Sequence, residues 1–251
     1  MMIRKLLVSA ATLALMTGAA WAADLPNTKG PPVFAPPPPP AFTWTGVYIG
    51  GQVGYEWGND TTTEFDPAGV PDGFVQGFRT NGVNGGGHIG FNYQVSQFVF
   101  GLEGDVNGAD NRGGFTLPNG NFEHVRDEIE AAILGRAGVA WDRVLIYAQG
   151  GAAFANFRYN YFNAGTGVGE IFNDGRVGWT VGGGIEYAID PNWTIFADYR
   201  YSDYGRFSNT SAFAFPGFTE RQHPRENLVQ AGFSYKFDIF GPPAAPIVSK
   251  Y

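Results

Sequence analysis

The sequence predicts an all-β protein, an eight-stranded antiparallel up-and-down barrel that crosses a membrane. Three observations support this prediction: an export signal, eight segments in which apolar and polar residues alternate, and connections that alternate between short and long. The chain has 251 residues and no cysteine, so disulfides cannot stabilise it. Only 16% of its residues are charged, against about 25% in an average soluble domain. This deficit indicates a surface that does not face water everywhere.

Residues 1–22 have the features of a secretory signal peptide. Arg4 and Lys5 precede an apolar run at residues 6–15, and Ala20-Trp21-Ala22 has the small residues of a cleavage site. The run is about half the roughly 20 residues that a membrane-spanning helix needs, so we expect export through the Sec pathway. Cleavage removes two positive charges and changes the formal net charge from -7 to -9, which argues against nucleic acid as a partner.

Proline-rich segments flank the region that is expected to fold. Residues 23–43 contain an unbroken proline run at 36–40, which predicts a stiff polyproline II tether. The barrel is predicted over residues 44–237, and a second proline-rich tail covers residues 238–251. An even number of strands returns the chain to the side where it started, so both proline-rich segments are predicted in the periplasm.

The first predicted strand, residues 45–57, shows the pattern that the others repeat. Val47 and Ile49 share an apolar face, whereas Tyr48, Gln52 and Glu56 share the opposite one. The same period of two predicts the second to fourth strands at 82–93, 98–107 and 128–141. Their apolar faces are marked by Ile89, Leu102 and Ile133 in turn. Their polar faces are marked by His88 in the second strand, by Glu103 and Asp105 in the third, and by Glu128, Glu130 and Arg136 in the fourth.

The remaining four strands are predicted at 145–156, 177–189, 193–202 and 228–237. The fifth strand has the weakest pattern, because only Gln149 marks its polar face. In the other three strands the apolar face carries Ile185, then Tyr199, then Phe233 and Tyr235. The polar face carries Glu186 in the sixth strand, Asp198 and Arg200 in the seventh, and Ser234 and Lys236 in the eighth.

The predicted connections alternate in length. Tight turns are expected around 94–97, 142–144 and 190–192, and four long loops at 58–79, 108–127, 157–176 and 203–227. Outer-membrane barrels have short periplasmic turns and longer extracellular loops. Aromatic residues near strand ends, such as Trp57, Trp141 and Trp179, match the girdles of such barrels, so the apolar face is assigned to lipid.

Four stretches carry a resemblance to a known family: WTGVYIGG at 44–51, GLEGD at 101–105, DYRYSDY at 198–204 and GFSYKF at 232–237. The chain resembles the small outer-membrane barrels of alphaproteobacteria, a group of surface antigens and hemin-binding proteins related to the membrane domain of the OmpA class. The resemblance implies location in the Gram-negative outer membrane, contact with outer-membrane lipids and lipopolysaccharide, and insertion by the barrel-assembly machinery. The implied assembly signal is Phe233, Tyr235 and Phe237, although fourteen residues follow it.

The predicted lumen contains a polar network that either plugs the barrel or lines a narrow, weakly cation-preferring channel. Its members are Glu56, His88, Glu103, Asp105, Glu130, Arg136, Glu186, Asp198, Arg200 and Lys236. Interior glycines such as Gly50 and Gly90 are expected to leave space beside them. We expect the plug, with the channel as the alternative.

Other functions have weaker support from the sequence. An enzyme is not expected, because none of the three histidines has a serine and an acid at a recognisable spacing, and no two histidines have the spacing of metal ligands. No cofactor is expected, except that the resemblance raises hemin binding; its candidate ligands in the predicted loops are His124, His223, Tyr159 and Tyr161. The loops are expected to face a host or another cell surface, with exposed aromatics at Phe74, Phe78, Phe213, Phe215 and Phe218.

Overall fold

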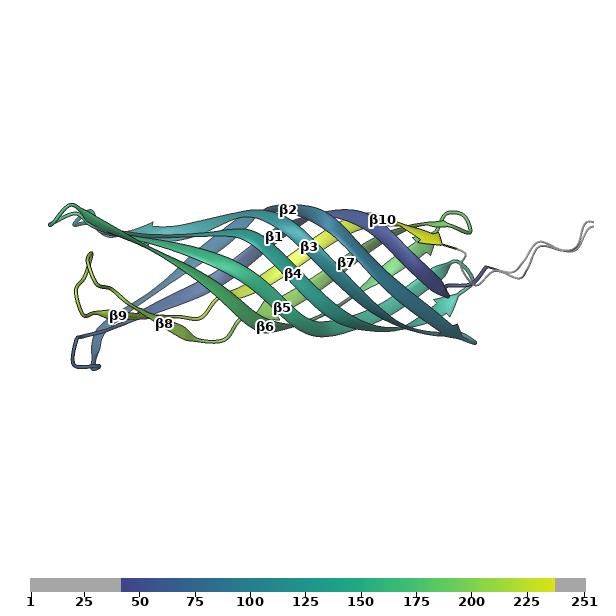
Figure 1. Cartoon of the computed structure of the whole chain (residues 1–251), viewed down its shortest axis with the longest axis horizontal. Helices are drawn as coiled ribbons and strands as arrows, with labels where there is room; N and C mark the ends of the chain where they lie inside the picture. Colours follow the sequence, from purple (N-terminus) through teal and green to yellow (C-terminus); the bar gives the residue numbers. More distant parts are fainter. Residues whose placement is uncertain (1–41, 238–251) are drawn as a thin grey trace, which may run out of the picture. The chain divides into compact units, whose positions relative to one another are not determined.

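The computed structural model describes residues 42–237, which form an antiparallel sheet of ten strands (Figure 1). The predicted signal peptide and C-terminal tail, and nearly all of the predicted tether, lie outside the described residues. The strands are β1 (Gly46–Phe65), β2 (Pro71–Val95), β3 (Phe98–Thr116), β4 (Phe122–Trp141), β5 (Val144–Asn163), β6 (Val168–Ala188), β7 (Trp193–Asp203), β8 (Phe207–Thr210), β9 (Thr219–Gln222) and β10 (Arg225–Phe237). The described residues contain no helix long and apolar enough to cross a membrane.

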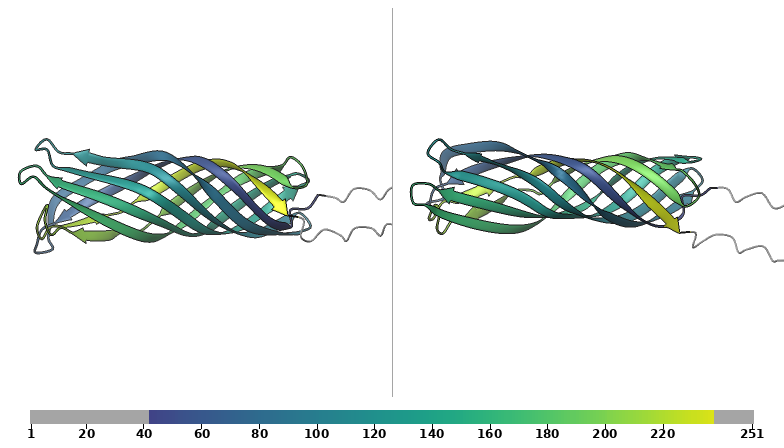
Figure 2. Two further views of the ribbon diagram at one scale, coloured as in Figure 1. Left: turned by 45° about the horizontal axis from the view of Figure 1, so that its top comes forward. Right: turned by 90° about the horizontal axis from the view of Figure 1, so that it is seen from above.

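The predicted eight-stranded up-and-down barrel is confirmed. Strands β1 to β7 pair in sequence order, β7 pairs with β10, and β10 pairs with β1, so the ring closes. Val47 lies opposite Phe237 at the closing seam, which places both ends of the barrel sequence together (Figure 2). Strands β8 and β9 form a short hairpin outside the ring, and β9 pairs with the end of β1.

Side chains alternate between the outside and the interior as the sequence predicts. Val53, Leu102 and Val177 are 70%, 68% and 66% exposed on the outside, whereas Gln52 and Thr180 are buried inside. A water-soluble barrel has the opposite arrangement, with apolar residues in its core. The exposed apolar band is therefore the lipid-facing surface.

The long connections are mostly strand, which corrects the prediction of four extended loops. β1 continues to Phe65 and β2 begins at Pro71, so only a short tip joins them, closed by a 2.9 Å hydrogen bond from Asp66 N to Val70 O. The tips at 117–121 and 164–167 are equally tight, and the fourth connection contains the β8–β9 hairpin. These strand extensions carry polar residues on both faces, so the sequence there does not show the alternation of apolar and polar residues that predicts a strand.

A bulge in β4 changes which residues face the interior. The pairing of β4 with β5 shifts between Asp127 and Glu130, which leaves Asp127 and Glu130 both buried and Ile129 exposed to lipid. A β-bulge inserts one residue and reverses the alternation beyond it. Glu128, predicted on the inner face, therefore has a side chain 42% exposed on the outside.

The predicted tight turns are confirmed at the other end of the barrel. Ser96 and Asp142 adopt the left-handed conformation, with φ of 56° and 51°, in the connections between β2 and β3 and between β4 and β5. Asp190 Oδ1 accepts hydrogen bonds from Asn192 N and Trp193 N in the third turn. The barrel thus has a short-turn end and a long-strand end (Figure 1).

Candidate functional site

An apolar layer fills the lumen at the short-turn end. Trp44 is 2% exposed and packs with Val99, Leu145 and Tyr147 from the barrel wall. Its indole Nε1 donates a hydrogen bond to Asp142 O at 3.3 Å, across the lumen from the start of β1. The segment that enters the first strand therefore covers this end of the lumen.

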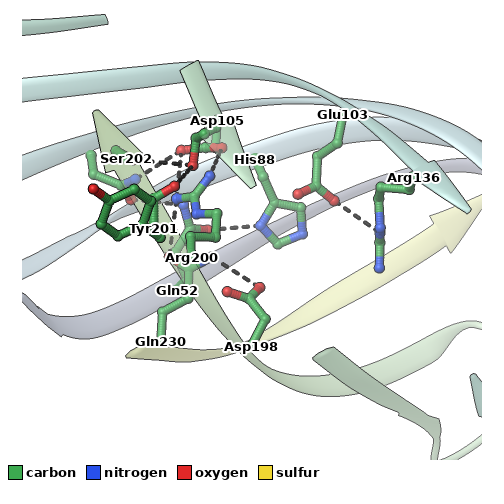
Figure 3. A network of polar contacts seen from close by, with 12 residues as sticks. Gln52, His88, Glu103, Asp105, Arg136, Asp198, Arg200, Tyr201, Ser202 and Gln230 are labelled. Atoms are coloured by element: carbon green, nitrogen blue, oxygen red, sulfur yellow. Dashed lines mark hydrogen bonds and ion pairs between the residues drawn. The ribbon is translucent and has the colours of Figure 1, made fainter. Parts of the chain in front are cut away.

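The middle of the lumen holds an ion network centred on Arg136 of β4. Its guanidinium pairs with Glu103 at 2.9 Å (Figure 3). It also pairs with Glu186 at 2.8 Å and lies 4.0 Å from the centre of the Tyr147 ring. Tyr48 donates to Glu103 and accepts from Arg136, both at 2.7 Å. These bonds connect β1, β3, β4 and β6, so the network spans the lumen.

A second set of polar contacts extends the network toward the long-strand end. Arg200 pairs with Asp105 at 2.7 Å, and His88 lies 2.7 Å from Gln52 Oε1 (Figure 3). The other ring nitrogen of His88 lies 2.9 Å from Ser234 Oγ. Buried charges are stable only when they are paired and hydrogen-bonded. Arg136 and Arg200 each form at least one ion pair with a carboxylate.

The interior glycines make room for these side chains, so they do not leave an open channel. A Cβ at Gly90 would lie 2.3 Å from the Tyr48 hydroxyl, and one at Gly50 would lie 2.5 Å from the His88 ring. The space predicted beside these glycines is therefore filled by side chains from neighbouring strands.

Beyond the network, the lumen becomes acidic. Glu56, Glu130 and Glu226 are buried and each has a carboxylate oxygen within 4.8 Å of the other two. Hard cations prefer such oxygen ligands, but a cluster of this kind also forms by sharing protons. The sequence predicts no metal site and does not predict this cluster, because Glu226 lies in the predicted loop at 203–227.

Further acids lie within the strand extensions, beyond the lipid-facing band. Burial raises the pKa of Glu220 to about 8 and the pKa of Glu64 to about 7, where the Asp72 carboxylate adds to the effect. Burial and the neighbouring Glu220 also raise the pKa of Glu123 well above its ordinary value. Asp60 accepts a 2.8 Å hydrogen bond from Tyr159, which is fully buried in an aromatic cluster with Phe157 and Phe207.

All ten residues of the predicted polar network lie inside the barrel. Nine are buried, and Glu103 has a side chain 11% exposed. Lys236 lies at the short-turn end, where its ammonium donates to Thr43 O and lies 4.6 Å from the Phe42 ring centre. The residues of the implied assembly signal, Phe233, Tyr235 and Phe237, lie on the outside of β10 beside Trp193.

The four candidate hemin ligands do not meet in one place. Tyr159 and Tyr161 are buried inside the strand extensions, where their rings stack. His124 lies on the outer face of β4 and stacks on Phe122, while His223 contacts Asp203 at 3.0 Å. Hemin binding therefore stays a prediction from resemblance. Of the aromatics predicted as exposed, Phe213 is 69% exposed but Phe78 is buried.

Beside the ion network and the acid cluster, the cavities of the lumen are small. A cavity between Glu56, Glu130 and Arg200 measures about 20 Å³, and another beside Asn111 and Asp127 measures about 10 Å³. A cavity needs roughly 10–15 Å³ to hold one water molecule. These cavities have room for about one water each and do not form a pore.

Comparisons with known proteins agree with this architecture. A family model described as an outer membrane protein beta-barrel domain matches residues 9–237. The chain is 29% identical over 218 residues to the 31 kDa outer-membrane immunogenic protein of Brucella melitensis, covering 80% of this chain and 88% of that protein. It is 27% identical over 238 residues to the 25 kDa outer-membrane immunogenic protein of Brucella abortus, covering 94% and 99%. The crystal structure of OprG from Pseudomonas aeruginosa is similar in fold, with a TM-score of 0.51 and 13% identity, covering 77% of this chain and 96% of that one.

Proposed function

The chain belongs to the outer-membrane β-barrel family and resides in the outer membrane of a Gram-negative bacterium, and from this premise we propose that it is a plugged barrel. It stabilises the envelope and acts through its exposed surface, without conducting solutes. The observation that carries this proposal is the network of Arg136, Glu103 and Glu186, whose ion pairs join β3, β4 and β6 inside the lumen. The buried Trp44 closes the short-turn end independently.

Planar-bilayer recording of the refolded protein tests the plug. We expect no stable ohmic steps, because the cavities beside the network hold about one water each. Faster gel migration before boiling than after it provides the folding control for the same sample. Reproducible steps from folded protein would overturn the plug and favour the channel.

A narrow channel that prefers cations is the second candidate, and one observation favours it. Ten acidic side chains are buried in the described barrel, against three buried arginine and lysine side chains, Arg136, Arg200 and Lys236. An acidic lumen attracts cations. If steps are recorded, a salt gradient across the bilayer gives their selectivity, and the channel proposal requires a reversal potential on the cation side.

We place the long-strand end outside the cell, where it is available to a host or to another cell surface. The relatives from Brucella are named immunogenic, which accords with surface exposure of those proteins. Phe213, in the connection between β8 and β9, is 69% exposed at this end. An epitope tag inserted at Gly120 should bind antibody on intact cells, while a tag beside Asp142 in a short turn should bind only after permeabilisation.

A further inference from the structure

The strand extensions carry a groove of arginines on the outside of the barrel, just beyond the lipid-facing band. Residues of β2 to β6 line a hollow of about 710 Å³, which we call the arginine groove. Its polar lining comprises Arg79, Arg112, Arg126, Arg158, His124, Glu128 and Asn160. On β4 the same outer face turns apolar across the bulge, at Ile129 and Ile133, which are 58% and 61% exposed. The groove therefore adjoins the band that contacts acyl chains.

Three of these arginines are direct neighbours across the sheet. Arg112 lies opposite Arg126, and Arg126 lies opposite Arg158. Side chains in such pairs have Cβ atoms about 4.5–5.5 Å apart, and like charges at this distance destabilise a sheet. An anion bound between the three guanidinium groups would remove this repulsion.

The carboxylates beside the groove compensate only part of its charge. Asp110 lies 2.7 Å from Arg112 and 3.3 Å from Arg126, and Glu128 lies 4.0 Å from both Arg126 and Arg158. Four arginines against these two carboxylates leave a surplus of two positive charges.

We propose that the arginine groove binds the phosphate groups of a lipid A headgroup in the outer leaflet. Guanidinium groups donate paired hydrogen bonds to phosphate oxygens, and three adjacent arginines can hold a diphosphorylated sugar. The groove lies on the outer face of the strands, close to the exposed Ile129 and Ile133, so the acyl chains of the same molecule would lie on these two side chains. The proposal rests on the orientation given above and is independent of whether the lumen conducts.

Binding of purified lipid A to the full-length protein in detergent, followed by native mass spectrometry, tests the site. We expect the protein to bind diphosphorylated lipid A at least tenfold more tightly than dephosphorylated lipid A. The double variant Arg126→Gln/Arg158→Gln should lose at least this tenfold preference. Arg143→Gln, which removes an exposed arginine at the short-turn end, is the matched control and should bind as the parent does.

A second variant is expected to strengthen the binding of lipid A, and it leaves all the arginines of the groove in place. Glu128→Gln removes the carboxylate that competes for Arg126 and Arg158, so it should strengthen binding of diphosphorylated lipid A by a few fold. Arg126→Lys keeps the charge without the paired donors and should fall between the parent and the double variant. Heat-modifiable migration verifies that each variant is folded.

Three outcomes would overturn the proposal. The first is equal affinity of the parent and the double variant for diphosphorylated lipid A, and the second is equal affinity of the parent for both lipids. The third is displacement of lipid A by inorganic phosphate at equal concentration, which would identify a general phosphate site in place of a glycolipid site. Antibody labelling of the tag at Gly120 reports the orientation separately, so failure of the orientation and failure of the site are distinguishable.

Discussion

At the scale of single residues, Arg136 is the side chain on which the interior depends most. Its side chain is 5% exposed and forms ion pairs with both Glu103 and Glu186. Removing one partner of a buried ion pair leaves an uncompensated charge, which is more harmful than removing the whole pair. We therefore expect substitution of Arg136 alone to lower the stability of the barrel more than substitution of Arg136 together with Glu103 and Glu186.

We expect Arg136→Met to destabilise the folded barrel by about 3–5 kcal/mol, because two carboxylates lose their cation. Urea unfolding in detergent, followed by heat-modifiable migration, measures the change. The combined variant Arg136→Met/Glu103→Gln/Glu186→Gln should recover most of the loss. A single variant as stable as the parent would show that the network contributes no net stability.

Glycine substitutions test whether the interior is filled. At Gly90 a Cβ would lie 2.3 Å from the Tyr48 hydroxyl and 2.8 Å from Leu102 O, so Gly90→Ala should cost about 1–3 kcal/mol through overpacking. Gly104→Ala is the matched control, since the nearest atom to its Cβ would be Ala132 O at 3.9 Å. Equal stability of the two variants by urea unfolding would mean that Tyr48 moves aside freely.

At the scale of elements, the strand extensions hold several acids in their interior, among them Glu64, Glu123 and Glu220. Burial raises the pKa of Glu220 to about 8 and the pKa of Glu64 to about 7, both above the ordinary glutamate value. The folded extensions then hold protons more tightly than the unfolded chain does. The stability that these two groups contribute is therefore fully present below the ordinary glutamate pKa and is lost as the pH rises through about 7 to 8.

The fall of stability with rising pH can be tested on the β8–β9 hairpin, which contains Glu220 and pairs with β1. Amide NMR signals of residues 207–222 should be sharp at about pH 5.5 and broadened at about pH 8.5, as the hairpin detaches. Glu220→Gln should keep them sharp at both values, and signals of the turn at Ser96 serve as the unaffected reference. Broadening at the lower pH in the parent would reverse the assigned sign.

The sequence predicts the membrane-spanning part of each strand because one rule governs it: apolar residues face lipid and polar residues face the lumen. It does not predict the extensions, where Arg126 and Asp127 are both polar but lie on opposite faces. The bulge before Glu130 also reverses the alternation without any change in composition. The acid cluster and the arginine groove both depend on register in these extensions, so only the three-dimensional pairing brings their residues together.

At the scale of the whole molecule, the lumen is closed by three layers in series. Trp44 lies at the short-turn end, Tyr48 belongs to the central ion network, and Tyr159 belongs to the aromatic cluster of the extensions. All three side chains are buried, with exposures of 2%, 3% and 0%. In a series of barriers, conduction requires every barrier to open, so removal of one layer leaves the others in place.

We therefore expect Trp44→Ala, Tyr48→Ala and Tyr159→Ala each to remain silent in planar-bilayer recordings. The triple variant should show ohmic steps that prefer cations, because ten buried carboxylates then line the opened path against three buried bases. Heat-modifiable migration must first show that the triple variant is folded. Stable steps from any single variant would mean that its layer is the sole barrier, and anion selectivity in the triple variant would mean that the acids of the lumen are protonated.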